Sequence, residues 1–276
     1  MERDQPVGAR LWAIAVWGTV GFFILNLLAV IASVVVNSFG TRWFNTWLPA
    51  GFTTRWYVAA WEEFQLDQVL IVTLEVVAAV VVLSALFGVP AAYALARRDF
   101  PGKRLVMLLF LLPLMVPPIT FGIPLATVLY RVGLAGSLSG VIVANLVPTV
   151  PFVILVMIPF VEQIDPRVEA AARVFGAGTW RLFTNILVPL LAPGILAALL
   201  LVLVRTIAMF ELTFFTSGPT SQTLVVALYY AVSAAGIRSG QSIDAMAVIY
   251  MVTTLIWLLI ALRFVNPTQI VGRART

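Results

Sequence analysis

The sequence predicts an all-α membrane protein with six transmembrane helices. Hydrophobic residues make up 62% of the 276 residues and charged residues only 11%, so a water-soluble domain could not cover its apolar surface. A transmembrane helix needs roughly 20 apolar residues. The segments that reach this length are 11–36, 69–96, 105–129, 138–161, 186–215 and 245–262.

The basic residues predict the orientation of these spans. With the N-terminus in the cytoplasm, the outer loops hold Arg42, Arg55, Arg131 and Arg238, and Arg205 lies within a span. The chain has 17 Lys and Arg residues, and all those not named above then face the cytoplasm. The positive-inside rule therefore predicts cytoplasmic termini and a cytoplasmic loop between the fourth and fifth spans. This topology accounts for the net charge of +5 without a nucleic-acid partner.

The first predicted unit, residues 1–65, contains the first span and an aromatic segment. The span is too long for a signal peptide and lacks a convincing small-residue cleavage site. Aromatic side chains are enriched where a bilayer meets water, so residues 37–65 are predicted to lie along the outer interface. The aromatic residues in this segment include Trp43, Trp47, Trp56, Tyr57 and Trp61.

The transmembrane core is predicted over residues 66–264, and residues 265–276 form a cytoplasmic tail. The second span ends in closely spaced small residues around Gly88 and Pro90, which permits close helix packing and a kink. Prolines are expected to interrupt the third and fourth spans similarly, as in transporters whose helices rearrange around a cavity. These prolines are Pro113, Pro117, Pro118, Pro124, Pro148 and Pro151.

A short polar helix is predicted in the cytoplasmic loop after the fourth span. Asp165 suits the N-cap, Pro166 suits the first helical position, and Gly176 with Gly178 can end the helix. A second helix is predicted to begin at Thr179.

This short helix is predicted to be amphipathic. Glu169 and Arg173 are spaced to form an i,i+4 pair on an exposed face. The apolar residues on one face are Val168, Ala171, Ala172 and Phe175. The loop therefore either lies on the membrane surface or docks a partner protein.

Three ionisable residues lie inside apolar segments: Glu75, Arg205 and Glu211. Each costs roughly 2.5–3.5 kcal/mol on insertion scales, so each needs a partner or a function. With about 1.5 Å rise per residue, all three fall in the outer half of the membrane. Arg205 and Glu211 do not share a helix face, so a bridge from Glu75 to Arg205 is weighed against contact with a solute. Glu211 is the preferred residue of a translocation path.

The cytoplasmic loop resembles that of the binding-protein-dependent ABC transporter permeases, with the motif E-A-A, three residues, G, nine residues, I-x-L-P. Valine replaces leucine in the second half, and the acidic residue stands one place before the E-A-A positions. We interpret Glu169 as a partial substitute for the motif glutamate. The matching residues are Glu169, Ala170, Ala171, Ala172, Gly176, Ile186 and Pro189.

Other segments are similar to the same family over about residues 53–264. The run at 53–57 resembles permeases of the spermidine/putrescine type, the branch to which the chain looks closest. Residues 88–104 resemble the family's entry into its first cytoplasmic loop, and residues 217–237 resemble its turn after the fifth span.

The resemblance implies the type I permease fold of ABC importers, in a bacterial inner membrane. In that family the loop forms a coupling helix that seats in a groove of a cytoplasmic ATPase. The chain has no phosphate-binding glycine loop, so we expect no enzyme and no cofactor in it. It also has no Cys or His, the commonest metal ligands, so we expect no metal site. Two partner ATPase subunits would bind ATP and Mg²⁺. A second permease subunit, either a different chain or a second copy, and an external solute-binding protein are also implied.

The solute stays open between a polyamine, ferric iron, a phosphonate, a sugar and an opine-like compound. The apolar segments contain two acidic residues and one Arg, and this excess of negative charge favours a cationic solute such as a polyamine. The alternative from another class is an ion-gradient-driven secondary transporter, in which the carboxylates would be coupling sites. The absence of an evident inverted hydropathy repeat argues against it, and the buried charges disfavour a purely structural scaffold.

Overall fold

The computed structural model describes residues 7–43, 46–233 and 239–264, so the predicted tail at 265–276 lies outside the described residues. Over these ranges the regular secondary structure is helical, apart from an isolated β-bridge between Gly40 and Phe52, which confirms the predicted all-α class. The chain forms two compact units. One contains Met1–Phe64 and Ala231–Ile249, and the other contains Gln65–Tyr230 and Tyr250–Thr276.

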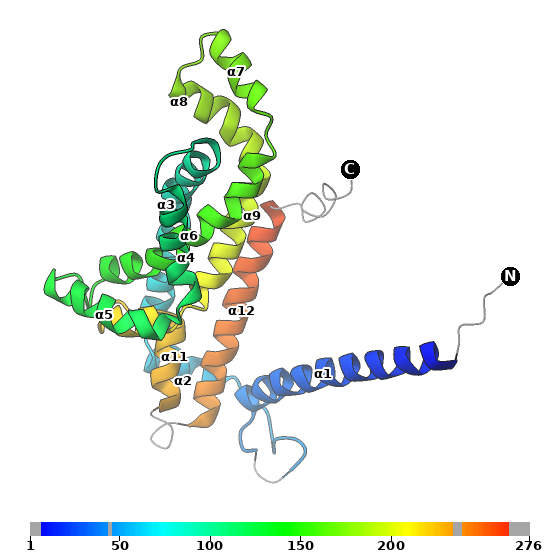
Figure 1. Cartoon of the computed structure of the whole chain (residues 1–276). Helices are drawn as coiled ribbons and strands as arrows, with labels where there is room; N and C mark the ends of the chain where they lie inside the picture. The colour runs from blue at the N-terminus through cyan, green and yellow to red at the C-terminus, as the bar shows by residue number, and fades with distance from the viewer. Residues whose placement is uncertain (1–6, 44–45, 234–238, 265–276) are drawn as a thin grey trace. The chain divides into compact units, whose positions relative to one another are not determined.

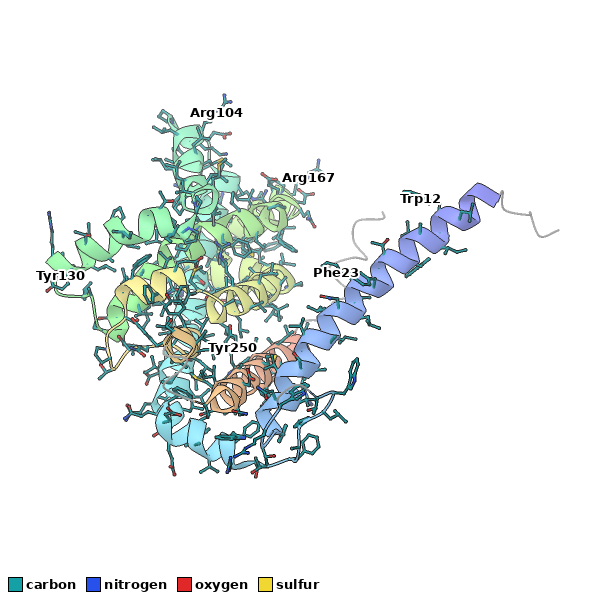
Figure 2. The ribbon with its side chains drawn as sticks, turned by 90° about the horizontal axis from the view of Figure 1, so that it is seen from below. Trp12, Phe23, Arg104, Tyr130, Arg167 and Tyr250 are labelled. Atoms are coloured by element: carbon teal, nitrogen blue, oxygen red, sulfur yellow. The ribbon has the colours of Figure 1, made fainter. Side chains whose placement is uncertain are left out.

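The first unit contains a long helix that is apolar along most of its length. Helix α1 (Val7–Phe39) is 33 residues long and contains the first predicted span. Its apolar side chains stand out from the helix, with Trp12 73% and Phe23 72% exposed (Figure 2). A helix that is apolar on every side requires lipid or a partner helix around it. This helix is therefore suited to the membrane and not to water.

The aromatic segment of the first unit folds into a turn and helix α2 (Arg55–Glu63). The indole Nε1 of Trp56 donates a 2.8 Å hydrogen bond to the carbonyl of Gly40, and the Tyr57 hydroxyl lies 2.8 Å from Ser38 Oγ. Trp47 is 98% exposed. Several rings of the predicted interfacial segment are thus fixed by hydrogen bonds, whereas Trp47 is free to enter a bilayer interface.

The second unit is built around three long helices that pack against one another: α3 (Leu66–Arg97), α6 (Leu138–Glu162) and α9 (Val188–Ile207). Glycines allow the close approach. A Cβ added to Gly88 would lie 2.6 Å from Val153 Cγ1, as the small residues of the second span predicted. A Cβ added to Gly194 would lie 2.5 Å from the Phe160 ring. The α3–α6 and α6–α9 contacts therefore require glycine, which has no side chain, at these two positions.

The third predicted span is not continuous. Helix α4 (Lys103–Met115) and helix α5 (Pro118–Arg131) are bent by 103° at the two residues between them. Pro117 and Pro118 follow one another, so two backbone donors are lost and Val116 is forced into an extended conformation. The predicted third span at 105–129 is therefore interrupted, as its prolines predicted, and the break lies at the tandem pair.

Single prolines do not break the helices in the way that the sequence suggested. Helix α3 continues through Pro90, α4 through Pro113, α5 through Pro124, and α6 through Pro148 and Pro151. In a membrane helix, neighbouring groups can satisfy the carbonyl that proline frees. The expectation that prolines interrupt the third and fourth spans is thus confirmed at the tandem pair and wrong at Pro113, Pro124, Pro148 and Pro151, whereas only a kink was predicted at Pro90.

The C-terminal half also differs in its boundaries. The fifth span begins at Thr179 and ends at Ile207, so residues 211–216 form a separate helix, α10 (Glu211–Thr216), instead of its continuation. Helix α11 (Leu224–Ser233) follows, and α12 begins at Gly240, not at 245 (α12, Gly240–Phe264). In the described part of the chain five helices are long and apolar enough to cross a membrane, or six if α4 and α5 form one bent span.

Candidate functional site

The predicted loop helix is present as α7 (Pro166–Val174), followed by α8 (Thr179–Leu182). Asp165 Oδ1 accepts a 2.8 Å hydrogen bond from the backbone N–H of Arg167, which confirms the predicted N-cap. The helix stops where Gly176 adopts a φ of +82°, a conformation that glycine takes without strain. In Figure 1, α7 and α8 lie together at one end of the second unit.

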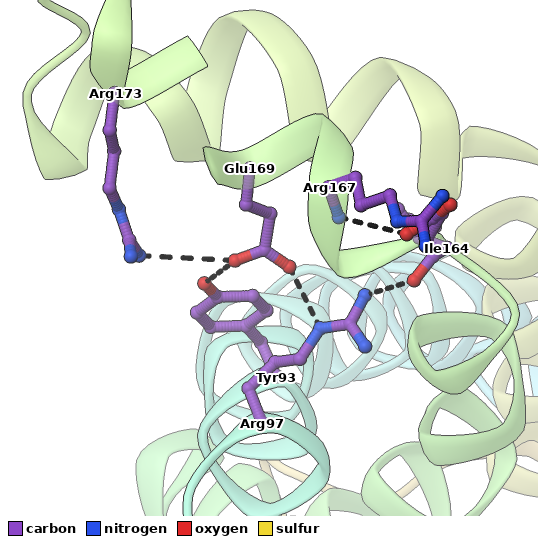
Figure 3. A network of polar contacts seen from close by, with 7 residues as sticks. Tyr93, Arg97, Ile164, Arg167, Glu169 and Arg173 are labelled. Carbon is purple, nitrogen blue, oxygen red and sulfur yellow. Dashed lines mark hydrogen bonds and ion pairs between the residues drawn. The ribbon is translucent and has the colours of Figure 1, made fainter. Parts of the chain in front are cut away.

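Glu169 is the charged residue at the centre of this site. It is only 6% exposed, although it belongs to a short polar helix. Its Oε2 accepts a 2.6 Å hydrogen bond from the Tyr93 hydroxyl, and its Oε1 accepts a 2.8 Å bond from Arg97 Nε (Figure 3). Hydrogen bonds to an ionised carboxylate are short and roughly twice as strong as neutral ones. Glu169 therefore holds α7 against the end of α3.

Arg97 joins three parts of the chain in this network. Its Nε binds Glu169 on α7, and its Nη2 donates to the carbonyl of Ile164, in the link between α6 and α7 (Figure 3). Arg97 itself is the last residue of α3. A guanidinium has several donors in a fixed plane, so one side chain can fix the relative positions of α3, α6 and α7.

The predicted pair between Glu169 and Arg173 is the weakest contact of this carboxylate. Arg173 Nη2 lies 3.9 Å from Glu169 Oε2, and the Arg173 side chain is 63% exposed. The interpretation of an exposed surface pair was therefore wrong for Glu169, because its main partners come from α3. Tyr93 and Arg97 were missed. Their i,i+4 spacing on one face, immediately before the span ends, is the signal that could have pointed to them.

The other residues of the loop motif divide between the interior and the surface. Ala172 and Ile186 pack against the buried core, and Ile186 lies in a π-helical turn, η1 (Phe183–Leu187). Ala170, Ala171 and Pro189 are exposed. The predicted apolar face is therefore split, because Ala172 points towards the protein's own core.

A group of large apolar side chains remains exposed around α7 and α8, and we call it the apolar patch. The fraction exposed is 40% for Val168, 85% for Val174, 90% for Phe175 and 78% for Trp180. Large apolar side chains that are exposed on a short polar helix and at the start of the next helix indicate a surface that another molecule covers. The site combines a rigidly held helix with an uncovered apolar surface.

The intramembrane charges are not brought together. Within the described residues, Glu75 is exposed on α3 and has no hydrogen bond or ion pair, and none joins it to Arg205. The Arg205 guanidinium instead lies 5.4 Å from the Phe152 ring centroid, and its buried Nε has no hydrogen-bond partner in the described part of the chain. The bridge between Glu75 and Arg205, one of the two alternatives weighed from the sequence, is therefore not formed between these described residues. Cation–π attraction to Phe152 compensates part of the cost of the charge.

Glu211 is the first residue of α10 and is half-buried. Its neighbour Phe210 belongs to an aromatic group with Phe214 and Tyr229, whose ring centroids lie 4.8–5.3 Å apart. Tyr229 is 45% and Tyr230 46% exposed. Glu211 thus lies next in sequence to a partly exposed aromatic group.

Comparison with known proteins gives consistent matches. The model of the family described as binding-protein-dependent transport system inner membrane component matches residues 84–270, a range that includes Tyr93, Arg97 and Glu169. The molybdenum transport system permease protein ModB of Escherichia coli K12 is 32% identical over 189 residues, which cover 63% of this chain and 82% of ModB. The sulfate transport system permease protein CysW of Synechocystis is 31% identical over 148 residues, covering 49% and 54% of the two chains.

Solved structures show the same fold. A chain of a bacterial ABC transporter that imports the acidic polysaccharide alginate superposes with a TM-score of 0.78 at 18% identity. The match covers 96% of this chain and all of the other.

Proposed function

Because this chain belongs to the binding-protein-dependent transport system inner membrane components, as its sequence predicted, we propose that it forms part of the path of a small polar solute across the bacterial inner membrane. It has the predicted fold of an ABC importer permease. An ion-gradient-driven transporter is not favoured, since the relatives compared above are permeases of ABC systems.

The observation that carries this proposal is the apolar patch on a helix that the protein holds in place. Val174 and Phe175 at the end of α7 and Trp180 on α8 are mostly exposed, while Glu169 on α7 is buried against α3. A groove on a cytoplasmic ATPase would cover the patch. Because Glu169 holds α7 firmly against α3, a movement of the ATPase would then be transmitted through α7 to the membrane helices. Docking of this patch is the coupling function that we propose for the loop.

The proposed assembly follows from this docking. Two ATPase subunits bind ATP and Mg²⁺ and perform the hydrolysis, so this chain is a transport subunit. A second permease subunit, either another chain or a second copy, and an external solute-binding protein complete the importer. The N- and C-termini lie in the cytoplasm, as the distribution of Lys and Arg predicts.

The relatives favour an oxyanion as the solute over the polyamine that the sequence suggested. ModB and CysW are named for molybdenum and sulfate, and another relative, from Streptomyces coelicolor, is named for diacetylchitobiose uptake. The guanidinium of Arg205, whose Nε has no hydrogen-bond partner among the described residues, is a positively charged group that attracts an anion. Uptake of molybdate, sulfate and spermidine by cells with and without the importer would decide between these classes.

Charge insertion into the patch tests the docking. In Phe175→Glu we expect the permease to insert normally but to lose its ATPase subunits during purification, because the carboxylate would have to be desolvated in an apolar groove. Gln163→Glu is the matched control, since it adds the same charge at an exposed position outside the patch. If Phe175→Glu retains as much ATPase as the control does, the patch is not the docking surface.

A further inference from the structure

Helix α3 is bonded at both of its ends to segments that are distant in sequence. At the inner end, Tyr93 and Arg97 bind Glu169 on α7 at 2.6 and 2.8 Å. At the outer end, Thr73 Oγ1 accepts a 2.9 Å hydrogen bond from the backbone N–H of Leu224, the first residue of α11. The two attachments are 20 residues apart on one helix, or about 30 Å.

The outer contact is as specific as the inner one. The first N–H groups of a helix have no partner within that helix, and the Thr73 hydroxyl from α3 supplies one for α11. Thr73 is 7% and Leu224 1% exposed, so this bond is shielded from water. Thr73 Oγ1 also donates to the carbonyl of Val69 at 2.6 Å, which fixes the direction of its hydroxyl.

Between its ends α3 has little freedom to bend independently of its neighbours. Val76, Val80 and Ala92 are at most 1% exposed, and Gly88 lies against Val153 of α6 without space for a methyl group. A close-packed helix moves as a unit, so displacement at one end appears at the other.

We propose that α3 transmits the movement of α7 to the turn before α11, with Glu169 and Thr73 as the positioning residues at its two ends. This proposal rests on the proposed function, because it takes α7 as the helix that the ATPase moves. The connected turn precedes the helix that carries Tyr229 and Tyr230, the exposed members of the aromatic group next to Glu211. Nucleotide binding on one side of the membrane would thus change the surroundings of the candidate path near the other side.

The absence of cysteine from the chain makes a direct test simple. Thr220→Cys places one thiol in the exposed turn before α11, where a water-soluble maleimide can reach it. The rate of labelling is measured in the complete importer, without nucleotide and with a non-hydrolysable ATP analogue. We expect the two rates to differ by roughly threefold in the otherwise unchanged chain, as for a shift between two conformations.

Variants at each end of α3 separate transmission from folding. Glu169→Ala and Thr73→Val should each reduce the difference between the two rates to less than about 1.5-fold, while ATPase subunits remain bound. Tyr93→Phe removes only one hydroxyl from the network, so it provides a milder test if Glu169→Ala fails to fold. It should partially reduce the difference between the two labelling rates. Thr73→Ser keeps the hydroxyl and should restore the response, and Arg173→Gln, which removes only the 3.9 Å contact, should leave it unchanged.

Two results would overturn the proposal. One is a full nucleotide response in folded Glu169→Ala and Thr73→Val, and the other is an equal loss in Arg173→Gln or Thr73→Ser. The proposed function fails separately, if Phe175→Glu retains the ATPase.

Discussion

Replacing Glu169 should cost far more stability than its place on a short surface loop suggests. The exposed i,i+4 pair that the sequence predicts would contribute only about 0.3–0.5 kcal/mol. In the structure Glu169 instead accepts hydrogen bonds from Tyr93 and from a guanidinium whose side chain is 15% exposed. A hydrogen bond to a charged group contributes about 1.5–3 kcal/mol, and leaving one partner of a buried pair unpaired costs about 3–5 kcal/mol. Because Arg97 lies at a helix end near water, we expect a loss of about 2–4 kcal/mol in Glu169→Ala.

A double-mutant cycle with Arg97→Met measures this contribution. The second substitution removes the unpaired guanidinium, so the double variant should recover at least about 1 kcal/mol relative to the sum of the single variants. The assay is thermal unfolding of the purified permease in detergent without ATPase, which excludes loss of an ATPase contact as the cause. Arg173→Gln is the control and should change stability by less than about 0.5 kcal/mol. The reasoning would be refuted if the stability losses of Glu169→Ala and Arg97→Met simply add in the double variant. It would also be refuted if Glu169→Ala loses no more stability than Arg173→Gln.

Three further predictions concern the membrane core. Gly194→Ala should destabilise the permease by about 1–3 kcal/mol in the same unfolding assay, because its Cβ would overlap a phenylalanine ring, whereas Gly178→Ala has open space and should not. Glu75→Gln and Arg205→Met should change the free energy of unfolding by amounts that add within about 0.5 kcal/mol in the double variant, since no bond joins the two residues. A double variant that is more stable than this sum predicts would indicate a bridge after all. Glu211→Gln should assemble normally but reduce uptake at least about fivefold, and unchanged uptake by a well-folded variant would remove Glu211 from the path.

Local patterns of the sequence predicted the elements that depend on neighbouring residues. The N-cap at Asp165, the glycine that ends α7 and the apolar spans all follow from residues close to one another. The tandem prolines at 117 and 118 were visible too, but the isolated prolines were given the same weight, so the effect of the isolated ones was overestimated. A bend of 103° requires the loss of consecutive donors, while a single proline is accommodated by surrounding helices.

The contacts across the chain could not be read from spacing. Tyr93 and Arg97 lie more than 70 residues before Glu169, and only the packing of α3 against α6 brings them together. The same packing turns Ala172 inward, so helical periodicity predicted the face of α7 but not which part of it the protein covers. For Arg205 the sequence offered a carboxylate as the partner, whereas the structure supplies the face of Phe152.

The composition of the intact complex tests the central claim most directly. Native mass spectrometry of the importer, purified from membranes at natural abundance through a tag on this chain, measures the mass and number of its subunits. We predict two permease subunits with two ATPase subunits, and loss of the ATPase subunits from the Phe175→Glu complex but not from the Gln163→Glu complex. A wild-type chain recovered alone or only with copies of itself, without a nucleotide-binding subunit, would contradict the account.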